Sequence, residues 1–376
     1  MSSGAKQSVL KALDNIDESL GAFINVGAER AIRSASQAPK RDLYGMTIGV
    51  KDLIDVSGMP TTYGSPRFRN HLARTTAPAI SSLERRGAIV IGKTNLNEFA
   101  FGVSGYNPHY GPILLPGDST RTAGGSSGGS AVAVAIGACR VAVGTDTSGS
   151  VRIPAACCGI WGFKLAHGSD LSGIHPLAPS FDSLGYLASE PGDLELILGL
   201  DTLPHARSLR IGRIDEDVTT PALPSSHSVI FQHEAWQVHR ESFNAFPTEF
   251  GKDLQRKLRR PLGDLRASQL NMAAWREEFI KAACPFDVLV QPVFEGKAPL
   301  LRDALAEYEL GTYADSSRLM ARTPIANALG WPALAFPGRG EALEVLAPPG
   351  RERALFAVAR ALSSTRFSDR PRRAPC

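Results

Sequence analysis

The stretch GGSSGGSAVAVAIGACRVAVGTDTSGSVRIPA, residues 124–155, decides the fold and the function of this chain. Residues 124–150 contain seven glycines and seven serines or threonines, with Arg140 and Asp146 as the only charged residues. Because glycine has no Cβ, such a density predicts turns in which the main chain comes close to another group. Between the two glycine-rich ends, residues 131–138 predict a helix of small residues and residues 140–143 predict a strand.

Helical and strand-like patterns alternate along the rest of the chain, which favours the α/β class. Helices are expected at 8–16, 22–35, 77–86, 194–200 and 351–362, and within 228–284 with breaks near 247 and 261. Strands are expected at 46–51, 88–92, 209–214 and 286–293. No internal repeat is apparent, and no linker rich in Gly, Ser or Pro divides the chain.

The composition excludes several classes of protein. The 376 residues are 43% apolar and 21% charged, so the chain can bury a large core. Of the net charge of +4, the segment 366–376 contributes +3 from four Arg and one Asp, leaving +1 for the other residues. We interpret this segment as a disordered basic tail. An almost neutral body argues against a nucleic-acid partner.

The cysteines and the apolar segments predict a cytoplasmic protein. The five cysteines are odd in number and form no C-x-x-C pair, which fits neither a disulfide framework nor a zinc site. The first 18 residues lack the apolar core of a signal peptide, and the longest apolar stretch, 131–143, is interrupted by Arg140. We therefore expect no membrane association and no metal.

Two short motifs offer alternative functions. Residues 87–94, GAIVIGKT, match the phosphate-loop pattern, but the spacer is itself strand-forming, which disfavours nucleotide binding. Residues 124–128 and 125–129 each match the G-x-S-x-G nucleophile elbow, with Ser126 or Ser127 as nucleophile. An α/β-hydrolase-like Ser-His-Asp esterase therefore remains an alternative, although a loop rather than a strand precedes the motif and no histidine stands in a recognisable context.

Three separated pieces of the sequence together resemble the amidase signature family of Ser-Ser-Lys amide hydrolases. They are GVKD at 49–52, GGSSGGSA at 124–131 and GTDTSGSVRIPA at 144–155, and the similarity continues through CCGIWGFK at 157–164 and APSFDSLGYLA at 178–188. The resemblance implies a single α/β/α domain around a large mixed β-sheet, over residues 1–365. It implies no cofactor and no metal, with a small-molecule amide as substrate and a homodimer as one possible assembly.

By the same resemblance, Ser150 is the nucleophile, Ser126 the bridging serine that relays its proton, and Lys51 the general base. A lysine base must be uncharged near neutral pH, and burial in charge-poor surroundings lowers a lysine pKa. The oxyanion would be held by backbone N–H groups of Thr147, Ser148, Gly149 and Ser150, with Ser127 among the substrate-binding residues.

Three positions depart from the family pattern, and one acidic residue near the motif is expected to have a structural role. Ser148 stands where a glycine is usual, Ala123 precedes the glycine cluster in place of proline, and Leu165 follows Gly-Phe-Lys in place of proline. If position 148 needs a positive φ, a serine there costs energy. We expect Asp146 to stabilise its loop through backbone N–H groups rather than to react.

The predicted activity is hydrolysis of a carboxamide to a carboxylic acid and ammonia or an amine, through an acyl-enzyme on Ser150. The run GVSGYNPHYG at 102–111 is similar to that of plant-type indole-acetamide hydrolases, which favours an aryl or small aliphatic primary amide. Two alternatives stay open: the amidase subunit of a tRNA-dependent amidotransferase, and a catalytically silent amidase-like interaction protein.

Overall fold

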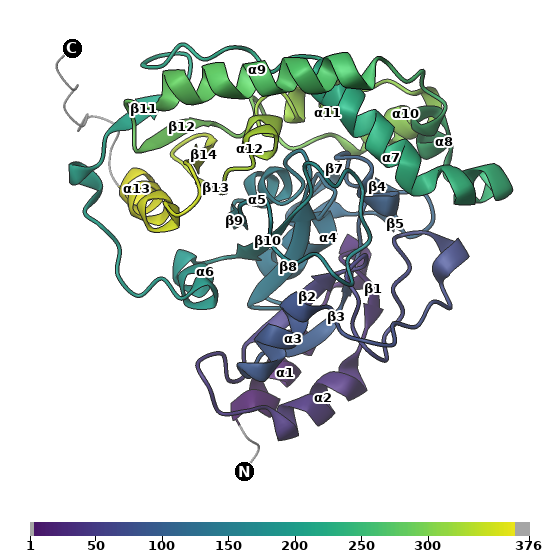
Figure 1. The fold of residues 1–376 in the computed structure, drawn as a ribbon. Coiled ribbons are helices and arrows are strands. Elements are labelled where there is room, and N and C mark those ends of the chain that lie inside the picture. The colour runs from purple at the N-terminus through teal and green to yellow at the C-terminus, as the bar shows by residue number, and fades with distance from the viewer. Residues whose placement is uncertain (1–3, 365–376) are drawn as a thin grey trace.

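A ten-stranded sheet passes through the whole molecule in the computed structural model, which describes residues 4–364 (Figure 1). The strand order is β1-β3-β2-β8-β10-β9-β13-β14-β12-β11. The strands are β1 Phe23–Val26, β2 Thr47–Lys51, β3 Ile89–Thr94, β8 Val141–Asp146, β9 Trp161–Lys164, β10 Ser183–Ala188, β11 Ile211–Arg213, β12 Val288–Pro292, β13 Ala333–Pro337 and β14 Ala342–Leu346. The predicted tail at 366–376 lies outside the described residues.

The sheet is mixed, as the expected fold requires. The pairs β2–β3, β2–β8 and β11–β12 are parallel, whereas β8–β10, β10–β9, β9–β13, β13–β14 and β14–β12 are antiparallel. Strands β2, β3 and β8 are buried along their whole length, because they lie inside the sheet and helices cover it. Two small two-stranded sheets lie apart from it, formed by β4 Tyr106–Asn107 with β5 Gly111–Pro112 and by β6 Leu114–Leu115 with β7 Asp118–Thr122.

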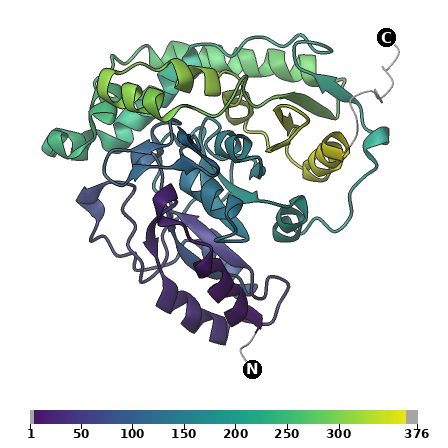
Figure 2. The same cartoon turned by 180° about the vertical axis from the view of Figure 1, so that it is seen from behind.

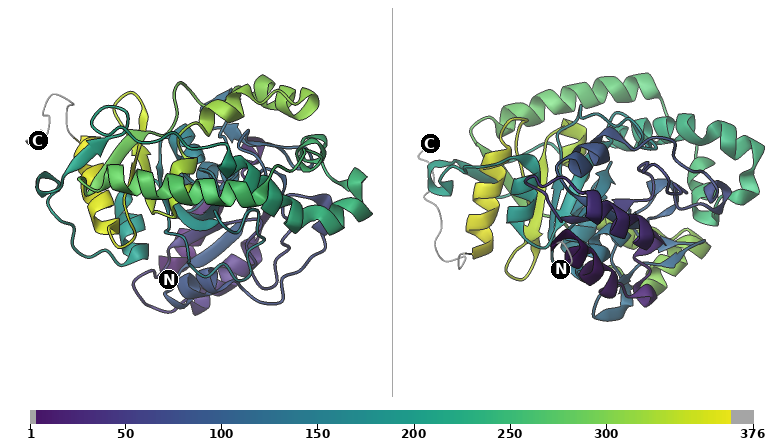
Figure 3. Two further views of the ribbon diagram at one scale, coloured as in Figure 1. Left: turned by 45° about the horizontal axis from the view of Figure 1, so that its top comes forward. Right: turned by 90° about the horizontal axis from the view of Figure 1, so that it is seen from below.

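Helices surround the sheet at both ends and on its faces. The long helices α7 and α9 run along one side of the molecule, whereas α1 and α2 lie at the opposite end (Figures 1 and 2). The views of Figure 3 show α9 crossing the molecule on the same side as strands β11 and β12. No helix among residues 4–364 has the length and apolar character needed to cross a bilayer. The helices are α1 Gly4–Asp14, α2 Ala28–Gln37, α3 Pro78–Arg85, α4 Gly128–Ala135, α5 Arg152–Cys158, α6 Pro191–Leu198, α7 Ser226–Ala245, α8 Lys252–Leu258, α9 Leu265–Ala283, α10 Leu301–Leu310, α11 Ala314–Leu319, α12 Pro324–Leu329 and α13 Glu352–Ser364.

The predicted start of one helix is wrong. The sequence pattern predicts a helix over all of residues 22–35, but Phe23–Val26 forms β1, and α2 begins only at Ala28. Strand β1 pairs antiparallel with β3 at the edge of the sheet, and the N–H of Gly27 donates to the carbonyl of Ile91 at 2.8 Å. The pairing partner is distant in the sequence, so the alanine-rich helix that follows the short strand dominates the local pattern.

Candidate active site

Lys51 and Ser126 meet in the interior of the molecule. Lys51 is the last residue of β2, and its Nζ donates to Ser126 Oγ at 2.7 Å and to Thr145 Oγ1 at 2.9 Å. Because β2 lies beside β8, the long lysine side chain reaches the end of β8, where Thr145 is found. Lys51 and Ser126 are both fully buried.

Burial lowers the pKa of Lys51 from its usual value to about 7, against the smaller opposing effects of Asp146 and Asp182. Removing an ammonium group from water disfavours its charged form, which is the physical cause of this shift. Neither carboxylate is close enough to Lys51 to form an ion pair with it in the described structure. Lys51 therefore loses its proton near neutral pH, as is required of a lysine base.

The two glycine-rich turns lie side by side. The N–H of Ser127 donates to the carbonyl of Ser150 at 3.1 Å, so the residue after Ser126 touches the turn that carries Ser150. Ser150 is 5% exposed, and its hydroxyl forms no hydrogen bond with another residue of the described chain. The Ser127 side chain is fully buried and donates to the carbonyl of Thr145 at 3.2 Å, so it connects this turn to the end of β8.

The loop between β8 and α5 presents backbone donors. The N–H groups of Thr147, Ser148 and Ser150 donate to no acceptor within residues 4–364, whereas the N–H of Gly149 donates to Asp146 Oδ1 at 2.8 Å. The sequence pattern predicts an oxyanion donor at Gly149 as well, but in this structure that donor serves Asp146. The three N–H groups without internal partners remain available for a developing negative charge.

The unusual Ser148 fits this loop without backbone strain. It is not among the non-glycine residues with positive φ, and its carbonyl accepts a hydrogen bond from Thr323 Oγ1 at 2.7 Å. The residue is 8% exposed. A positive φ would have penalised a serine here. The position therefore tolerates a side chain, and the glycine requirement lies at Gly149, whose φ is +115°.

Asp146 anchors the loop, as expected, through a buried ion-pair network. Its carboxylate accepts from the N–H groups of Gly149 and Val151 and from the guanidinium of Arg152, with Nη2 to Oδ1 at 2.8 Å. Burial by itself would raise the pKa of Asp146, but Arg152 holds it well below its usual range. Arg152 in turn donates to Glu344 Oε2 at 2.7 Å.

This network ties the loop between β8 and α5 to Thr323, Asn327 and Glu344, and most of it is not evident in the sequence. Arg152 also donates to the carbonyl of Thr323 at 2.8 Å and to Asn327 Oδ1 at 2.6 Å. Arg152 follows Ser150 by two residues and could have been found from its place in the motif. Thr323, Asn327 and Glu344 are far away in the sequence, and no local pattern indicates that they contact the loop.

The phosphate-loop match is explained by the fold. Residues 89–94 form β3, and Lys93 is fully buried in an ion pair with Asp52 Oδ1 at 2.9 Å. A phosphate-binding lysine follows an open loop and points towards the ligand. Here the lysine stands within a strand and its charge is matched internally, so the chain has no phosphate loop at this place. Asp52 is next to Lys51 in the sequence, but its carboxylate pairs with Lys93 and therefore does not form an ion pair with Lys51.

The nucleophile-elbow alternative lacks its partners. No histidine of residues 4–364 forms a hydrogen bond with Ser126 or Ser127, whose hydroxyls contact Lys51 and the Thr145 carbonyl. The strand before the glycine cluster, β7, belongs to a small separate sheet. A Ser-His-Asp arrangement needs a histidine next to the serine. The structure thus brings a lysine, rather than a histidine, to this serine.

Gly149→Ala is expected to lower the free energy of unfolding by about 2–4 kcal/mol, because it combines an unfavourable φ with a steric clash. A Cβ at this position would lie 2.3 Å from Thr323 Oγ1 and 2.6 Å from Thr323 Cβ. Gly159→Ala is the matched control, since its φ is +66° but nothing lies within 4 Å of the added Cβ. Urea unfolding of both variants measures the difference, and an equal loss in the two would contradict the close packing of Thr323 on the loop.

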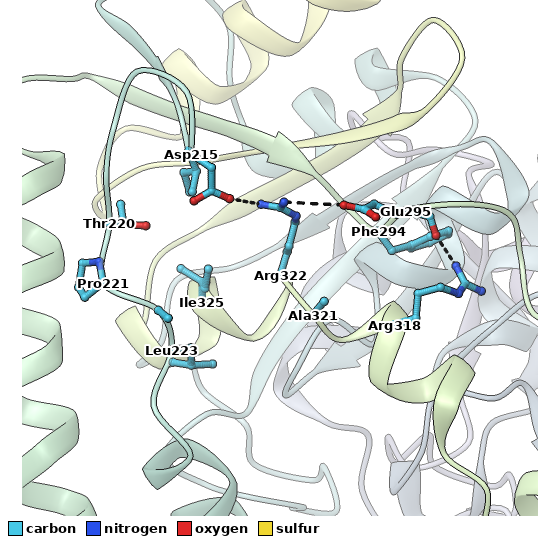
Figure 4. Close-up of a pocket in the computed structure, with 12 residues that line it drawn as sticks. Asp215, Thr220, Pro221, Leu223, Phe294, Glu295, Arg318, Ala321, Arg322 and Ile325 are labelled. Atoms are coloured by element: carbon cyan, nitrogen blue, oxygen red, sulfur yellow. Dashed lines mark hydrogen bonds and ion pairs between the residues drawn. The ribbon is translucent and has the colours of Figure 1, made fainter.

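A cavity of about 380 Å³ lies near this site, between the stretch after β11 and the segment that leads from α11 into α12 (Figure 4). Arg322 Nη1 pairs with Asp215 Oδ2 at 2.8 Å across the cavity, and Nη2 lies 4.0 Å from Glu295 Oε1. Arg322 is followed by Thr323, which contacts the loop between β8 and α5 through the carbonyl of Ser148. None of Lys51, Ser126 or Ser150 lines the cavity.

Known proteins resemble this chain in sequence and in fold. Residues 6–200 match the sequence model of the family described as Amidase. Over 206 residues the chain is 41% identical to a glutamyl-tRNA(Gln) amidotransferase subunit from Anaeromyxobacter sp. (strain K), a match that covers 52% of this chain and 42% of that protein. Over 184 residues it is 44% identical to the indoleacetamide hydrolase of Pseudomonas syringae pv. syringae, covering 48% of this chain and 41% of the relative.

The chain thus matches less than half of the length of these two relatives, but its fold is matched almost completely. A solved structure described as a crystal structure of amidase superposes with a TM-score of 0.82 at 26% sequence identity, covering 94% of each chain. The matched sequence region contains Lys51 and the turns that carry Ser126 and Ser150. Since the family model spans more than half of the chain and the fold agrees over nearly all of it, the chain belongs to the amidase family.

Proposed function

We propose that this protein hydrolyses carboxamides through an acyl-enzyme on Ser150, with Ser126 as the bridging serine and Lys51 as the general base. The observation that carries the proposal is the 2.7 Å contact between Lys51 Nζ and Ser126 Oγ in a fully buried setting. Family membership supports the reaction class, and the adjoining turns that carry Ser126 and Ser150 support the pairing of the two serines.

The proposed first step moves two protons and forms one bond. Ser150 Oγ attacks the amide carbonyl carbon as its proton passes to Ser126, while the proton of Ser126 passes to neutral Lys51. The resulting oxyanion is stabilised by the free N–H groups of Thr147, Ser148 and Ser150. Lys51, now charged, returns a proton through Ser126 to the leaving nitrogen, and the C–N bond breaks to release ammonia or an amine.

The second step regenerates the enzyme with water. A water molecule attacks the ester carbonyl of the acyl-enzyme as its proton passes through Ser126 to Lys51. Lys51 then returns the proton through Ser126 to Ser150 Oγ, while the ester bond breaks and the carboxylic acid leaves. The pKa of Lys51 of about 7 suits both directions of this transfer, because a general base works best when its pKa is close to the working pH. No metal or cofactor takes part in the proposed reaction.

Ammonia release across a panel of amides tests this function. The panel contains aryl acetamides, small aliphatic primary amides and dicarboxylic monoamides, and we expect turnover of aryl or small aliphatic members, in line with the similarity to an indoleacetamide hydrolase. Acid quenching during turnover, followed by peptide mass spectrometry, should find the acyl group on Ser150. An acyl group on another residue would overturn the assigned nucleophile, and absence of ammonia from every amide would overturn the function.

The amidase subunit of a tRNA-dependent amidotransferase is a second candidate, favoured by the 41% identity to a protein with that role in its name. Such a subunit would release ammonia from glutamine, so glutamine belongs in the same panel. Turnover of glutamine alone would favour this candidate over an aryl or aliphatic amidase. A homodimer and a cytoplasmic location remain predictions from the sequence.

A further inference from the structure

A strained segment supports the turn that carries Ser126. In the 3₁₀ turn Glu98–Ala100, Phe99 has φ +50° and Ala100 has φ +59°. Residues other than glycine rarely adopt such φ values. Each residue that does so costs roughly 1–3 kcal/mol, and the conformation persists only where the surrounding structure holds it. The segment from Asn97 to Gly105, called here the support segment, must therefore be held by contacts from elsewhere in the chain.

The support segment packs directly against the two glycines before Ser126. A Cβ added to Gly125 would lie 2.0 Å from Asn97 Oδ1, and a Cβ added to Gly105 would lie 2.8 Å from the carbonyl oxygen of Gly124. Asn97 is fixed in this place, because its Nδ2 donates to Ser104 Oγ at 3.0 Å. A displacement of the support segment would consequently displace the backbone of the Ser126 turn.

Helix α8 and the residue before it hold both ends of the strained turn. The N–H of Gly251 donates to Glu98 Oε2 at 2.9 Å, and Lys257 Nζ donates to the carbonyl of Phe101 at 2.8 Å. That carbonyl has no other hydrogen-bond partner among residues 4–364. Lys257 is only 6% exposed, and its charge is matched by Asp253 Oδ2 at 2.6 Å.

We propose that Lys257 is a positioning residue for Ser126, acting through the carbonyl of Phe101 and the support segment. The proposal rests on the function proposed above. According to this proposal, helix α8 affects the rate of the reaction, although it lies outside the region that the family model matches. A part of the chain beyond the matched region thus sets the geometry of the relay between Ser150 and Lys51, without touching the substrate.

Lys257→Met tests the proposal, because methionine keeps most of the side-chain length and removes the donor. We expect kcat to fall about 10- to 100-fold, since misplacement of a reacting group by about 1 Å has effects of this size, and KM to change less than about threefold. Lys257→Arg, which keeps the charge and can donate to the same carbonyl, should recover much of the kcat. Lys252→Met is the matched control on the same helix, since the ion pair of Lys252 with Glu309 is exposed, and its kcat should equal that of the wild type.

The activities of the wild type and of Lys257→Met distinguish a failure of the positioning role from a failure of the proposed function. If the wild type releases no ammonia from any amide, the function fails and the positioning role fails with it. If the wild type is active and folded Lys257→Met keeps its kcat, or loses only thermal stability, the positioning role alone is wrong. Should Lys257→Met not fold, the double variant Lys257→Met/Glu307→Gln also removes the charge of buried Glu307, which lies 3.9 Å from Lys257 Nζ, while Asp253 keeps Arg256 as an ion-pair partner at 3.8 Å. Wild-type kcat in that variant would also overturn the role.

Discussion

Ser150→Ala is expected to reduce kcat for amide hydrolysis by about 10³- to 10⁶-fold while the protein remains folded. The variant loses the only atom that is proposed to bond to the substrate. Its hydroxyl makes no hydrogen bond inside the described chain, so its removal leaves no partner unsatisfied and the free energy of unfolding should change by less than about 1 kcal/mol. The measurements are ammonia release with the best amide of the panel and urea unfolding of the same preparations.

Ser172→Ala serves as the control, since Ser172 is exposed and far from the glycine-rich turns in sequence. It should keep full activity. If Ser150→Ala retained more than about a tenth of the wild-type kcat, Ser150 would not be the nucleophile. Mass spectrometry of the acylated wild type would then show whether Ser126 or Ser127 carries the acyl group, as the nucleophile-elbow alternative requires.

Lys51→Met is expected to lower kcat by about 10³-fold or more, because the relay loses the base at its end. The same change should leave the free energy of unfolding unaltered or increased. It replaces a fully buried amine, which has no ion-pair partner in the described part of the chain, by an apolar side chain of similar length. Lys93→Met gives the contrast. Lys93 is paired with buried Asp52, so its removal should destabilise the protein by about 3–5 kcal/mol. Equal losses of stability in the two variants would contradict these different roles.

The wild type should show a pH dependence that Lys51→Met lacks. Lys51 accepts a proton only when it is neutral, and burial lowers its pKa to about 7. The value of kcat/KM should therefore rise as the pH increases through about 7, and fall by about tenfold for each unit of pH below it. A plateau from about pH 5 to about pH 8 would show that no group with this pKa must be deprotonated. The residual activity of Lys51→Met, measured over the same pH range, should not show this rise of kcat/KM through about pH 7.

Much of the fold and of the candidate site could be predicted because their signals are local. The strand that ends at Lys51, the small-residue helix after Ser127 and the strand before Asp146 each follow from the periodicity of their own residues. Strand β1 could not be predicted in this way, because four residues next to a strong helical pattern carry little information, and its pairing with β3 stabilises it from a distance.

The sequence by itself identified Lys51, Ser126 and Ser150 as candidates, because the motifs that contain them resemble those of the amidase signature family. Only the tertiary structure decided how these residues are held and charged. It pairs Lys93 with Asp52, gives Lys51 no ion pair within residues 4–364, and links Arg152 to Glu344, 192 residues away. It also places Lys257 against Phe101. Burial and ion pairing depend on neighbours that are distant in the chain, so a local pattern cannot encode them, and burial is what lowers the pKa of Lys51.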